Sequence, residues 1–327
     1  MVSFATPSLM GSGGPAFMPD TPAIDASEPL PENISWITPR APLKKLTTFR
    51  VGGQADWLAL PRNVVDVQIA VDWANAANLP ITFLGAGSNL LVSDQGIRGL
   101  VICTRRFRKT EFDESRGRVT VAAGEPLPPL AWKAAKRGWR GLEWAVGIPG
   151  TVGGAVVMNA GAHGDCAARR LLAATVIDPQ RGVVHLTPEH LNFSYRTSAL
   201  QGAQTIVLDA TFQLEDGHDP AAVVAETLSG LEQRRASQPY DLPSCGSVFR
   251  NPYPQTAGWL IEQAGLKGYQ LGQAQVARRH ANFILNRGGA TANDIYRLIH
   301  HVQDQVQSQW ALWLHPEVKF IGQFPAL

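Results

Sequence analysis

Six glycines occur within the eighteen residues GIPGTVGGAVVMNAGAHG, positions 147–164, beside an apolar run and without any lysine or arginine. A glycine inside a helix or strand costs about 0.5–1 kcal/mol relative to alanine, so a cluster of them needs a structural reason. The stretch therefore predicts one of two arrangements. Either the chain makes bulges and tight turns at a strand corner, or a ligand approaches the bare backbone closely.

A second glycine-rich stretch, LGAGSNLLVSDQG at 84–96, follows a predicted strand. Successive unblocked N–H groups in such a turn form a concave anion site that suits a diphosphate. Gly85 and Gly87 lack the third glycine of the dinucleotide-binding fingerprint, and the sequence contains no P-loop motif. The spacing alone leaves a phosphate loop and a plain tight turn as equal alternatives, although two such loops could hold one dinucleotide between them.

Composition restricts the class of protein. With 327 residues, 45% of them hydrophobic and 17% charged, the chain is ordered and long enough for two domains. A net charge of +2 and short basic runs argue against nucleic-acid binding, and RRFRK at 105–109 is expected to be a solvated surface. Cys103, Cys166 and Cys245 have neither disulfide nor zinc spacing, which indicates a reduced, cytoplasmic compartment and no metal site. No apolar run is long enough for a transmembrane helix, so no membrane partner is expected.

Hydrophobic periodicity predicts an α+β chain with many short strands and few strand–helix–strand units. We expect residues 1–40 to form a mostly disordered extension, with an apolar docking contact at 36–37 and an ordered body from about Leu46. Thr291 and Asp294 have the spacing of a capping box at the start of an amphipathic helix. Strands are predicted at 81–84, 99–104, 118–124, 172–177, 182–186, 205–213 and 316–322, and helices at 127–138, 256–265 and 291–310.

Several polar residues outside the glycine loops could carry chemistry, and each has an ordinary alternative. Ser247 lies in a glycine-containing turn that is not a hydrolase nucleophile elbow, and turn chemistry alone explains such a serine. Nearby Cys245 is either a reactive thiol or an inert small hydrophobe. Arg196 could hold a carboxylate through two nitrogens, or it could lie on a surface strand. For Glu317 the ordinary alternative is an exposed carboxylate. For His280 it is a buried histidine that is bonded to the backbone.

Seven motifs occur in order along the chain, and together they are far more specific than any one alone. They are TTFRVGG at 47–53, GAGSNLLVSDQG at 85–96, GIPGTVGGAVVMNAGAHG at 147–164, FSYRTS at 193–198, QPYDLPSCGSVFRNP at 238–252, AGLKG…HANFILN at 264–286 and HPEVKFIG at 315–322. This series resembles the UDP-N-acetylenolpyruvoylglucosamine reductase family, flavoenzymes of peptidoglycan synthesis. The resemblance covers residues 46–322 and favours the shorter, type II-like subclass, because the chain is too short for an extra substrate-covering segment.

The resemblance implies an FAD-binding fold of the vanillyl-alcohol-oxidase (PCMH) type, in two subdomains at 41–220. An α+β substrate-binding domain at 221–327 would follow, and its last strand, 316–322, would return Glu317 to the flavin site. The resemblance also implies a cytoplasmic, monomeric enzyme with bound FAD. Its partners would be NADPH as reductant and UDP-N-acetylglucosamine enolpyruvate as substrate, with no nucleic acid.

The family reaction gives three residues a role. NADPH reduces the FAD, and flavin N5 then delivers a hydride to the methylene carbon of the enolpyruvyl group, which yields UDP-N-acetylmuramate. The resemblance assigns the proton to Ser247 and assigns stabilisation of the substrate carboxylate and developing enolate to Arg196 and Glu317. Preorganised groups of this kind lower the barrier where charge develops.

Binding residues are also carried over from the resemblance, residue by residue. Sugar-nucleotide contacts fall on Tyr195, Arg250 and Asn251, and no metal ligand is implied. FAD contacts fall on Gly85, Ala86, Gly87, Ser88, Asn89, Leu90, Gly147, Ile148, Pro149, Gly150, Thr151, Gly153, Gly154 and Ala155.

The chain departs from the family pattern at a few positions. Cys245 and Arg250 stand where alanine and lysine are common, Ala277-Arg278 replaces a Ser-Glu pair, and His163 replaces a tyrosine. A guanidinium can still contact a phosphate, though with different geometry from lysine. Two other functions stay open at this level. One is another FAD oxidoreductase of the same superfamily, acting on an alcohol or sugar, and the other is a non-catalytic flavin- or nucleotide-binding module.

Overall fold

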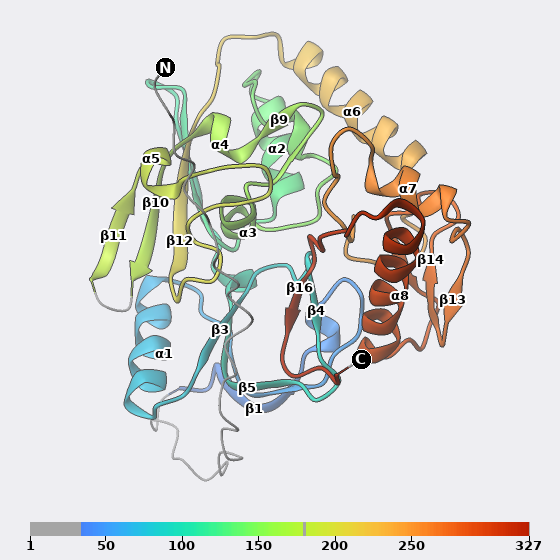
Figure 1. The fold of residues 1–327 in the computed structure, drawn as a ribbon. Helices are drawn as coiled ribbons and strands as arrows, with labels where there is room; N and C mark the ends of the chain where they lie inside the picture. The colour runs from blue at the N-terminus through green and yellow to red at the C-terminus, as the bar shows by residue number, and fades with distance from the viewer. Residues whose placement is uncertain (1–33, 179–180, 327) are drawn as a thin grey trace, which may run out of the picture.

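The computed structural model describes residues 34–178 and 181–326, so most of the expected extension at 1–40 lies outside the described residues. A four-stranded sheet in the order β1-β2-β5-β3 opens the fold (Figure 1). Strands β2 and β3 pair in parallel with β5, and β1 pairs antiparallel with β2. The elements of this part are β1 (Ile37–Pro42), η1 (Lys44–Leu46), β2 (Gln54–Ala59), α1 (Val64–Ala76), β3 (Ile81–Leu84), β4 (Leu90–Val92), β5 (Ile97–Cys103) and η2 (Thr104–Arg106).

A second, antiparallel sheet follows in the order β11-β10-β12-β7-β6. Its strands are β6 (Thr110–Asp113), β7 (Arg118–Ala122), β10 (Leu171–Asp178), β11 (Gly182–Leu186) and β12 (Ile206–Gln213). Around it lie α2 (Leu127–Ala135), η3 (Glu143–Ala145), α3 (Val152–Met158), β8 (Gly161–Ala162), β9 (Asp165–Cys166), α4 (Ala167–Arg170) and α5 (Pro188–Leu191). Helix α3 packs on β12 and β7 and places the glycine-rich stretch against this sheet.

The C-terminal part is built around α8, and its chain end returns to the first part. Its elements are α6 (Pro220–Ser237), α7 (Ala257–Gln263), β13 (Gln270–Leu271), β14 (Ala274–Val276), β15 (Ile284–Asn286), α8 (Ala292–Trp310) and β16 (Lys319–Ile321). Helix α6 packs on α2 and η3. Strand β16 pairs in parallel with β4, which brings the end of the chain beside the loop at 85–89.

Helix α8 forms as the sequence predicts. The Thr291 side chain accepts the N–H of Asp294, and the Asp294 carboxylate accepts the N–H of Thr291, so the predicted capping box is confirmed. Apolar residues at helical spacing face the core and are almost completely buried. They are Ile295, Leu298, Ile299, Val302 and Val306.

Two expectations about elements are wrong. Order begins before Leu46, because strand β1 pairs with β2 and buries Ile37 and Ala41. The last strand is shorter than 316–322, and Glu317 precedes it. Of the two arrangements left open for 147–164, the structure excludes the strand corner, because Thr151 starts a helix there by accepting the N–H of Gly154 at 3.4 Å.

Asp94 joins the first part to the C-terminal part. Its two carboxylate oxygens accept the N–H groups of Ala292 and Asn293, each at 2.9 Å, at the start of α8. We expect Asp94→Ala to lower the free energy of unfolding by about 1–2 kcal/mol, the usual effect of losing an N-terminal cap. Urea denaturation would measure the loss. An equal loss in Asp304→Ala, an exposed aspartate later on the same helix, would show that the cap contributes nothing specific.

In the part of the chain that the structure describes, no helix has both the length and the apolar character needed to cross a membrane. The same residues contain no group of three or more His, Cys, Asp or Glu side chains arranged to hold a metal ion.

Candidate active site

The two glycine-rich loops lie against each other, although they are far apart in the sequence. A Cβ atom added at Gly85 would lie 2.6 Å from the hydroxyl oxygen of Thr151. One added at Gly150 would lie 3.8 Å from the Ser88 hydroxyl oxygen. The structure thus brings together the two loops that were predicted to bind one dinucleotide.

Arg105 fixes the orientation of the first loop. Its guanidinium donates hydrogen bonds to the carbonyl oxygens of Gly85 at 3.2 Å, Leu46 at 2.8 Å and Ala86. The expectation of a solvated surface is wrong for this arginine, because it is partly buried beneath the loop. The N–H groups of residues 86–89 donate no hydrogen bond within the described part of the chain. A row of free N–H groups suits a diphosphate, so the first loop fits the diphosphate of FAD.

The second loop, 147–155, uses its N–H groups differently. Those of Ile148, Val152 and Gly153 already donate to carbonyl oxygens of the surrounding chain, and that of Gly154 donates to a side-chain hydroxyl. Phosphate binding through backbone N–H groups alone therefore suits the first loop better than the second. The second loop exposes Pro149 and Gly154 and partly exposes Ile148, and such apolar side chains beside bare backbone suit close packing of a flat ring.

The space around the helical glycines gives a test of this arrangement. A Cβ atom at Gly154, which is exposed, meets only a hydroxyl oxygen 3.5 Å away, whereas one at buried Gly153 would lie 2.8 Å from Ala123 Cβ. We expect Gly154→Val to weaken FAD binding with little change in the thermal stability of the flavin-free protein. Gly153→Val should lower that stability as well. Titration with FAD and thermal unfolding would measure the two effects.

A matched control is available in helix α6. A Cβ atom at Gly230 meets no other atom within 4 Å, so Gly230→Val adds the same bulk to a helix without a steric conflict. It should leave FAD affinity unchanged. If Gly154→Val binds FAD as tightly as Gly230→Val does, the second loop does not contact the cofactor.

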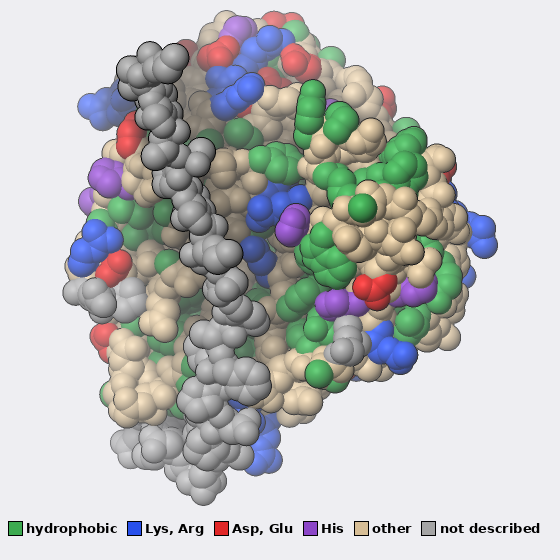
Figure 2. All heavy atoms as spheres, viewed as in Figure 1, with side chains coloured by type: hydrophobic (Ala, Val, Ile, Leu, Met, Phe, Trp, Pro, Cys, Tyr) green, Lys and Arg blue, Asp and Glu red, His purple; other side chains and the backbone are tan. Residues whose placement is uncertain are grey.

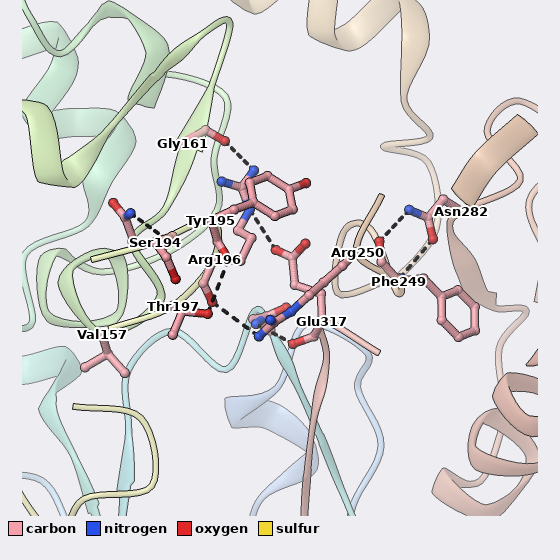
Figure 3. Close-up of polar contacts among 12 residues, drawn as sticks. Val157, Gly161, Ser194, Tyr195, Arg196, Thr197, Phe249, Arg250, Asn282 and Glu317 are labelled. Carbon is pink, nitrogen blue, oxygen red and sulfur yellow. Dashed lines mark hydrogen bonds and ion pairs between the residues drawn. The ribbon is translucent and has the colours of Figure 1, made fainter. Parts of the chain in front are cut away.

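Arg196 and Glu317 form the polar centre of the site, as Figure 3 shows. Arg196 Nε donates to Glu317 Oε1 at 3.1 Å, and Nη2 donates to the carbonyl oxygen of Gly161 at 2.6 Å. Arg196 has a φ of 55°, in the left-handed region that residues other than glycine rarely adopt. The side-chain amide of Gln201 donates to the Arg196 carbonyl oxygen at 2.8 Å and supports this conformation. The Arg196 backbone is thus held in a strained conformation, as is common at functional sites. The two side-chain hydrogen bonds define the position of its guanidinium.

Asn89 connects the first loop to the segment that carries Glu317. Its side-chain amide donates to the Glu317 carbonyl oxygen at 3.1 Å, and its own carbonyl oxygen accepts the N–H of Lys319 at 3.0 Å. Strands β4 and β16 then continue in parallel, with Lys319 opposite Leu90. Hydrogen bonds therefore hold the predicted catalytic glutamate beside the predicted cofactor loop.

Ser247 is brought to the same place by backbone pairing. It forms an isolated antiparallel bridge with Phe283, and the next carbonyl oxygen, that of Val248, accepts the N–H of Glu317 at 2.7 Å. The Ser247 hydroxyl makes no hydrogen bond within the described part of the chain, and the residue is partly exposed. This hydroxyl is consequently available to a ligand.

The three predicted sugar-nucleotide residues occupy different positions. A guanidinium nitrogen of Arg250 donates to the Arg196 carbonyl oxygen at 3.4 Å, while its buried Nε has no partner among residues 34–178 and 181–326. The exposed ring of Tyr195 lies over the Arg196 guanidinium, 5.1 Å from its carbon to the ring centre. The side-chain oxygen of Asn251 accepts the N–H of Ala257 at 3.0 Å, which leaves its amide nitrogen free. Arg250 and Tyr195 therefore belong to the polar centre, and Asn251 also supports the start of α7.

Lys319 is a basic residue of this region that sequence reasoning missed. It lies close enough to Arg250 and Glu317 to interact electrostatically, and burial and the Arg250 charge lower its pKa while the Glu317 charge opposes them. Figure 2 shows Lys and Arg side chains gathered in a hollow near the middle of one face. The spacing within PEVKFIG could have revealed it, because residues two apart in an extended chain point to the same side.

Burial raises the pKa of two neighbouring acidic groups, the Glu317 carboxyl and the Cys245 thiol. Burial raises the pKa of Glu317 above its ordinary value, although the Arg196 guanidinium acts in the opposite direction. Burial also raises the pKa of the Cys245 thiol, and the Glu317 charge adds to that rise. Cys245 therefore remains a protonated, buried thiol, which is the inert alternative expected for a lone cysteine.

His280 is bonded to the backbone, which is the structural alternative that the sequence left open for it. Its Nδ1 accepts the N–H of Asn282 at 3.3 Å, and its ring lies 4.9 Å from that of Phe283. Burial lowers the pKa of His280, and the charges of Lys267 and Arg234 add to that effect. It supports the loop and makes no contact with the polar centre among the interactions described.

Comparison with known proteins first defines the class. The FAD binding domain model matches residues 55–187, which contain both glycine-rich loops, and the chain is an FAD-dependent oxidoreductase with an α+β fold. The model for the C-terminal domain of UDP-N-acetylenolpyruvoylglucosamine reductase matches residues 238–321. The chain belongs to the UDP-N-acetylenolpyruvoylglucosamine reductase family.

Individual relatives support this assignment over nearly the whole chain. A reductase of this name from Nostoc sp. is 58% identical over 297 residues, which is 91% of this chain and 90% of the relative. One from Synechocystis sp. is 55% identical over 290 residues, covering 88% and 92%. The solved structure of the Thermus caldophilus enzyme superposes with a TM-score of 0.72 at 34% identity, covering 88% of this chain and 98% of that one.

Proposed function

We propose that the protein reduces UDP-N-acetylglucosamine enolpyruvate to UDP-N-acetylmuramate, with NADPH as the reductant, in peptidoglycan precursor synthesis. The observation that carries this proposal is the hydrogen-bonded Arg196–Glu317 pair beside the first cofactor loop, with Ser247 next to Val248, whose carbonyl oxygen accepts the N–H of Glu317. Asn89 makes that connection through two hydrogen bonds. The family relationship independently supports the same substrate.

The first loop, 85–90, would hold the FAD diphosphate, and residues 147–155 would lie against the cofactor. When bound, FAD supplies the redox chemistry by accepting a hydride from NADPH and passing it on to the substrate. All other steps fall to the protein's own residues. Arg105 keeps the N–H groups of the first loop turned toward the diphosphate by binding the carbonyl oxygens on its other side.

Arg196 would bind the carboxylate of the enolpyruvyl group. Addition of a hydride to the methylene carbon moves negative charge toward this carboxylate, so fixed positive charge nearby stabilises the transition state more than the ground state. Arg250 and Lys319 add to the positive potential of the same region. Glu317 would hold the Arg196 guanidinium in place through their hydrogen bond, and burial raises the pKa of its carboxyl against the opposing Arg196 charge.

Ser247 would supply the proton to the carbon next to the carboxylate. A hydroxyl is a weak acid in water, but the carbon that accepts the proton is strongly basic, so correct placement matters more than the serine pKa. The hydroxyl has no competing partner within the described part of the chain and is therefore free to approach that carbon. Tyr195, Arg250 and Asn251 would contact the sugar nucleotide.

We also propose the division into an FAD-binding unit at 41–220 and a substrate-binding unit at 221–327, in which Glu317 returns to the cofactor site. Helix α6, at the start of the second unit, packs on the first and would connect them. A cytoplasmic monomer of the shorter, type II-like subclass is part of the same proposal. Sedimentation of the purified protein would test the monomer.

Stopped-flow absorbance of the purified yellow protein tests the function. NADPH should bleach the flavin band under anaerobic conditions, and the enolpyruvyl sugar nucleotide should then restore it rapidly. Bleaching followed by rapid reoxidation with oxygen but not with this substrate would indicate another oxidoreductase of the superfamily. A bound flavin that NADPH does not bleach would indicate a non-catalytic module.

A further inference from the structure

Asn282 is buried, with 3% of its surface exposed, and it lies within the motif HANF just before β15. Both ends of its side-chain amide bind the backbone of one residue, as Figure 3 shows. The N–H of Phe249 donates to Asn282 Oδ1 at 2.9 Å, and Asn282 Nδ2 donates to the Phe249 carbonyl oxygen at 2.8 Å. The Asn282 side chain therefore forms with Phe249 the two backbone hydrogen bonds that a neighbouring β-strand would otherwise form.

The backbone of Asn282 extends the same pairing. Its carbonyl oxygen accepts the N–H of Val248 at 2.8 Å, and its own N–H donates to His280 Nδ1 at 3.3 Å. Three hydrogen bonds thus join Asn282 to two consecutive residues, Val248 and Phe249. These residues stand directly between Ser247 and Arg250, which face the substrate in the proposed function.

The opposite side of the same segment is bound to the chain that carries Glu317. The Val248 carbonyl oxygen accepts the N–H of Glu317 at 2.7 Å, and the N–H of Arg250 donates to the His315 carbonyl oxygen at 2.9 Å. The segment 247–250 is therefore held between Asn282 on one side and residues 315–317 on the other. Phe249 is itself 2% exposed, so its backbone groups have no access to water as an alternative partner.

No other side chain within the described part of the chain binds the Phe249 backbone. Loss of the amide would leave a buried N–H and a buried carbonyl oxygen without partners, and such groups are costly in a dry interior. The segment would shift to satisfy them. A displacement of about 1 Å at a reacting group can reduce a rate about 100-fold.

We infer that Asn282 is a positioning residue that sets the places of the Ser247 hydroxyl and the Arg250 guanidinium. This inference rests on the proposed function. It predicts that changes at Asn282 slow reoxidation of the reduced holoenzyme by substrate about 10–100-fold. Bleaching by NADPH and the FAD content should stay close to wild type, because no hydrogen bond within the described part of the chain joins Asn282 to either cofactor loop.

Asn282→Asp gives a pH-dependent test. A protonated carboxyl has one donor and one acceptor and can restore both bonds to Phe249, whereas the carboxylate has no donor and repels the Phe249 carbonyl oxygen. Burial raises the pKa of such a carboxyl. The reoxidation rate of Asn282→Asp, divided by that of wild type at each pH, should therefore rise as the pH is lowered from about 8.5 to about 6.

Coupling to Ser247 separates positioning from a general loss of stability. If Asn282 acts in part through Ser247, Asn282→Ala should slow reoxidation less in the Ser247→Ala background than it does in wild type. Substrate affinity of the oxidised holoenzyme, measured by calorimetry without NADPH, should fall in Asn282→Ala because Arg250 also shifts. Rates are to be compared below the unfolding midpoint of every variant.

Asn286 offers a matched control four residues away. It is also a buried asparagine, and it binds the Phe49 carbonyl oxygen and three consecutive N–H groups, but it does not touch segment 247–250. Asn286→Ala should lower thermal stability without changing the reoxidation rate. Equal slowing in Asn286→Ala, additive losses in the double variant, or a flat pH ratio in Asn282→Asp would each overturn the inference. Should Ser247→Ala itself reoxidise at the wild-type rate, the proposed function would fail together with the inference.

Discussion

Ser247→Ala should give a yellow protein that keeps FAD and is bleached by NADPH, but that the enolpyruvyl sugar nucleotide reoxidises about 10²–10⁴ times more slowly than wild type. That range is typical for the loss of a positioned general acid. Stopped-flow absorbance would measure the two half-reactions separately. The defect should lie in the second one alone.

The structure explains why Ser247→Ala should slow the reaction with substrate without lowering the stability of the protein. The Ser247 hydroxyl makes no hydrogen bond within the described part of the chain, and the place of the residue is set by its backbone bridge to Phe283. Alanine keeps that backbone. The unfolding midpoint of Ser247→Ala should therefore match that of wild type, and a large fall in stability or loss of FAD would show a structural role instead.

Cys245→Ala is the matched control for this prediction. The thiol lies two residues from Ser247, but Cys245 is only 4% exposed, so the thiol cannot approach a substrate carbon, and burial also raises its pKa. Removal of one sulfur atom should cost some stability through a small cavity. The reoxidation rate should stay near wild type, and a loss as large as that of Ser247→Ala would make the thiol the rival proton donor.

Arg196→Met should slow reoxidation by substrate about 10²–10³-fold, the usual effect of removing one preorganised group that stabilises developing negative charge. Methionine keeps much of the length of the side chain but removes both the hydrogen bond to Glu317 and the one to the Gly161 carbonyl oxygen. Arg196→Lys retains a charge but not the planar fork, so it should fall between Arg196→Met and wild type. Equal rates in Arg196→Met and wild type would remove Arg196 from the mechanism.

The stability of Arg196→Met should depend on pH in a defined direction. Burial already raises the pKa of Glu317 in the folded protein, and the Arg196 guanidinium opposes that rise. Without Arg196 the pKa of Glu317 should rise further. A carboxyl whose pKa is higher folded than unfolded loses stabilisation as the pH rises from its unfolded value through its folded one.

Urea unfolding at several pH values checks that direction. The free energy of unfolding of Arg196→Met, relative to wild type, should decrease as the pH rises above the ordinary glutamate pKa of about 4.3. The double variant Arg196→Met/Glu317→Gln carries no titrating carboxyl there and should lose this dependence. A constant difference at all pH values would show that the two side chains are not coupled.

Local structure was largely predictable from the sequence. The helix at 291–310 has its capping box and apolar face in the residues themselves, and Thr291 and Asp294 form the predicted hydrogen bonds. Short apolar strands such as Ile81–Leu84 and Gly182–Leu186 also lie where alternation and turn residues predict them. These features depend on neighbours along the chain, and a sequence displays such neighbours directly.

The stretch at 147–164 shows what local reasoning could not decide. Its glycines left a strand corner and a ligand-binding loop as alternatives, and in the structure Thr151 caps a helix whose first turn contains Gly153 and Gly154. Glycine is unfavourable in a helix, so its presence there had to have a tertiary cause. A Cβ atom at Gly153 would meet Ala123 at 2.8 Å, which shows that close packing on the second sheet excludes any side chain at that position.

The sequence by itself determined the family, the order of the motifs, and the residue types that can bind a carboxylate, bind a diphosphate or donate a proton. Only the tertiary structure decided which of them meet. Arg196 and Glu317 are 121 positions apart, and Asn89 and Glu317 are 228 apart, yet both pairs are joined by hydrogen bonds. The roles of Arg105 beneath the first loop and of Asn282 against Phe249 also depend on such contacts. Burial and hydrogen bonding between distant segments are properties of the folded chain, and no local pattern of residues encodes them.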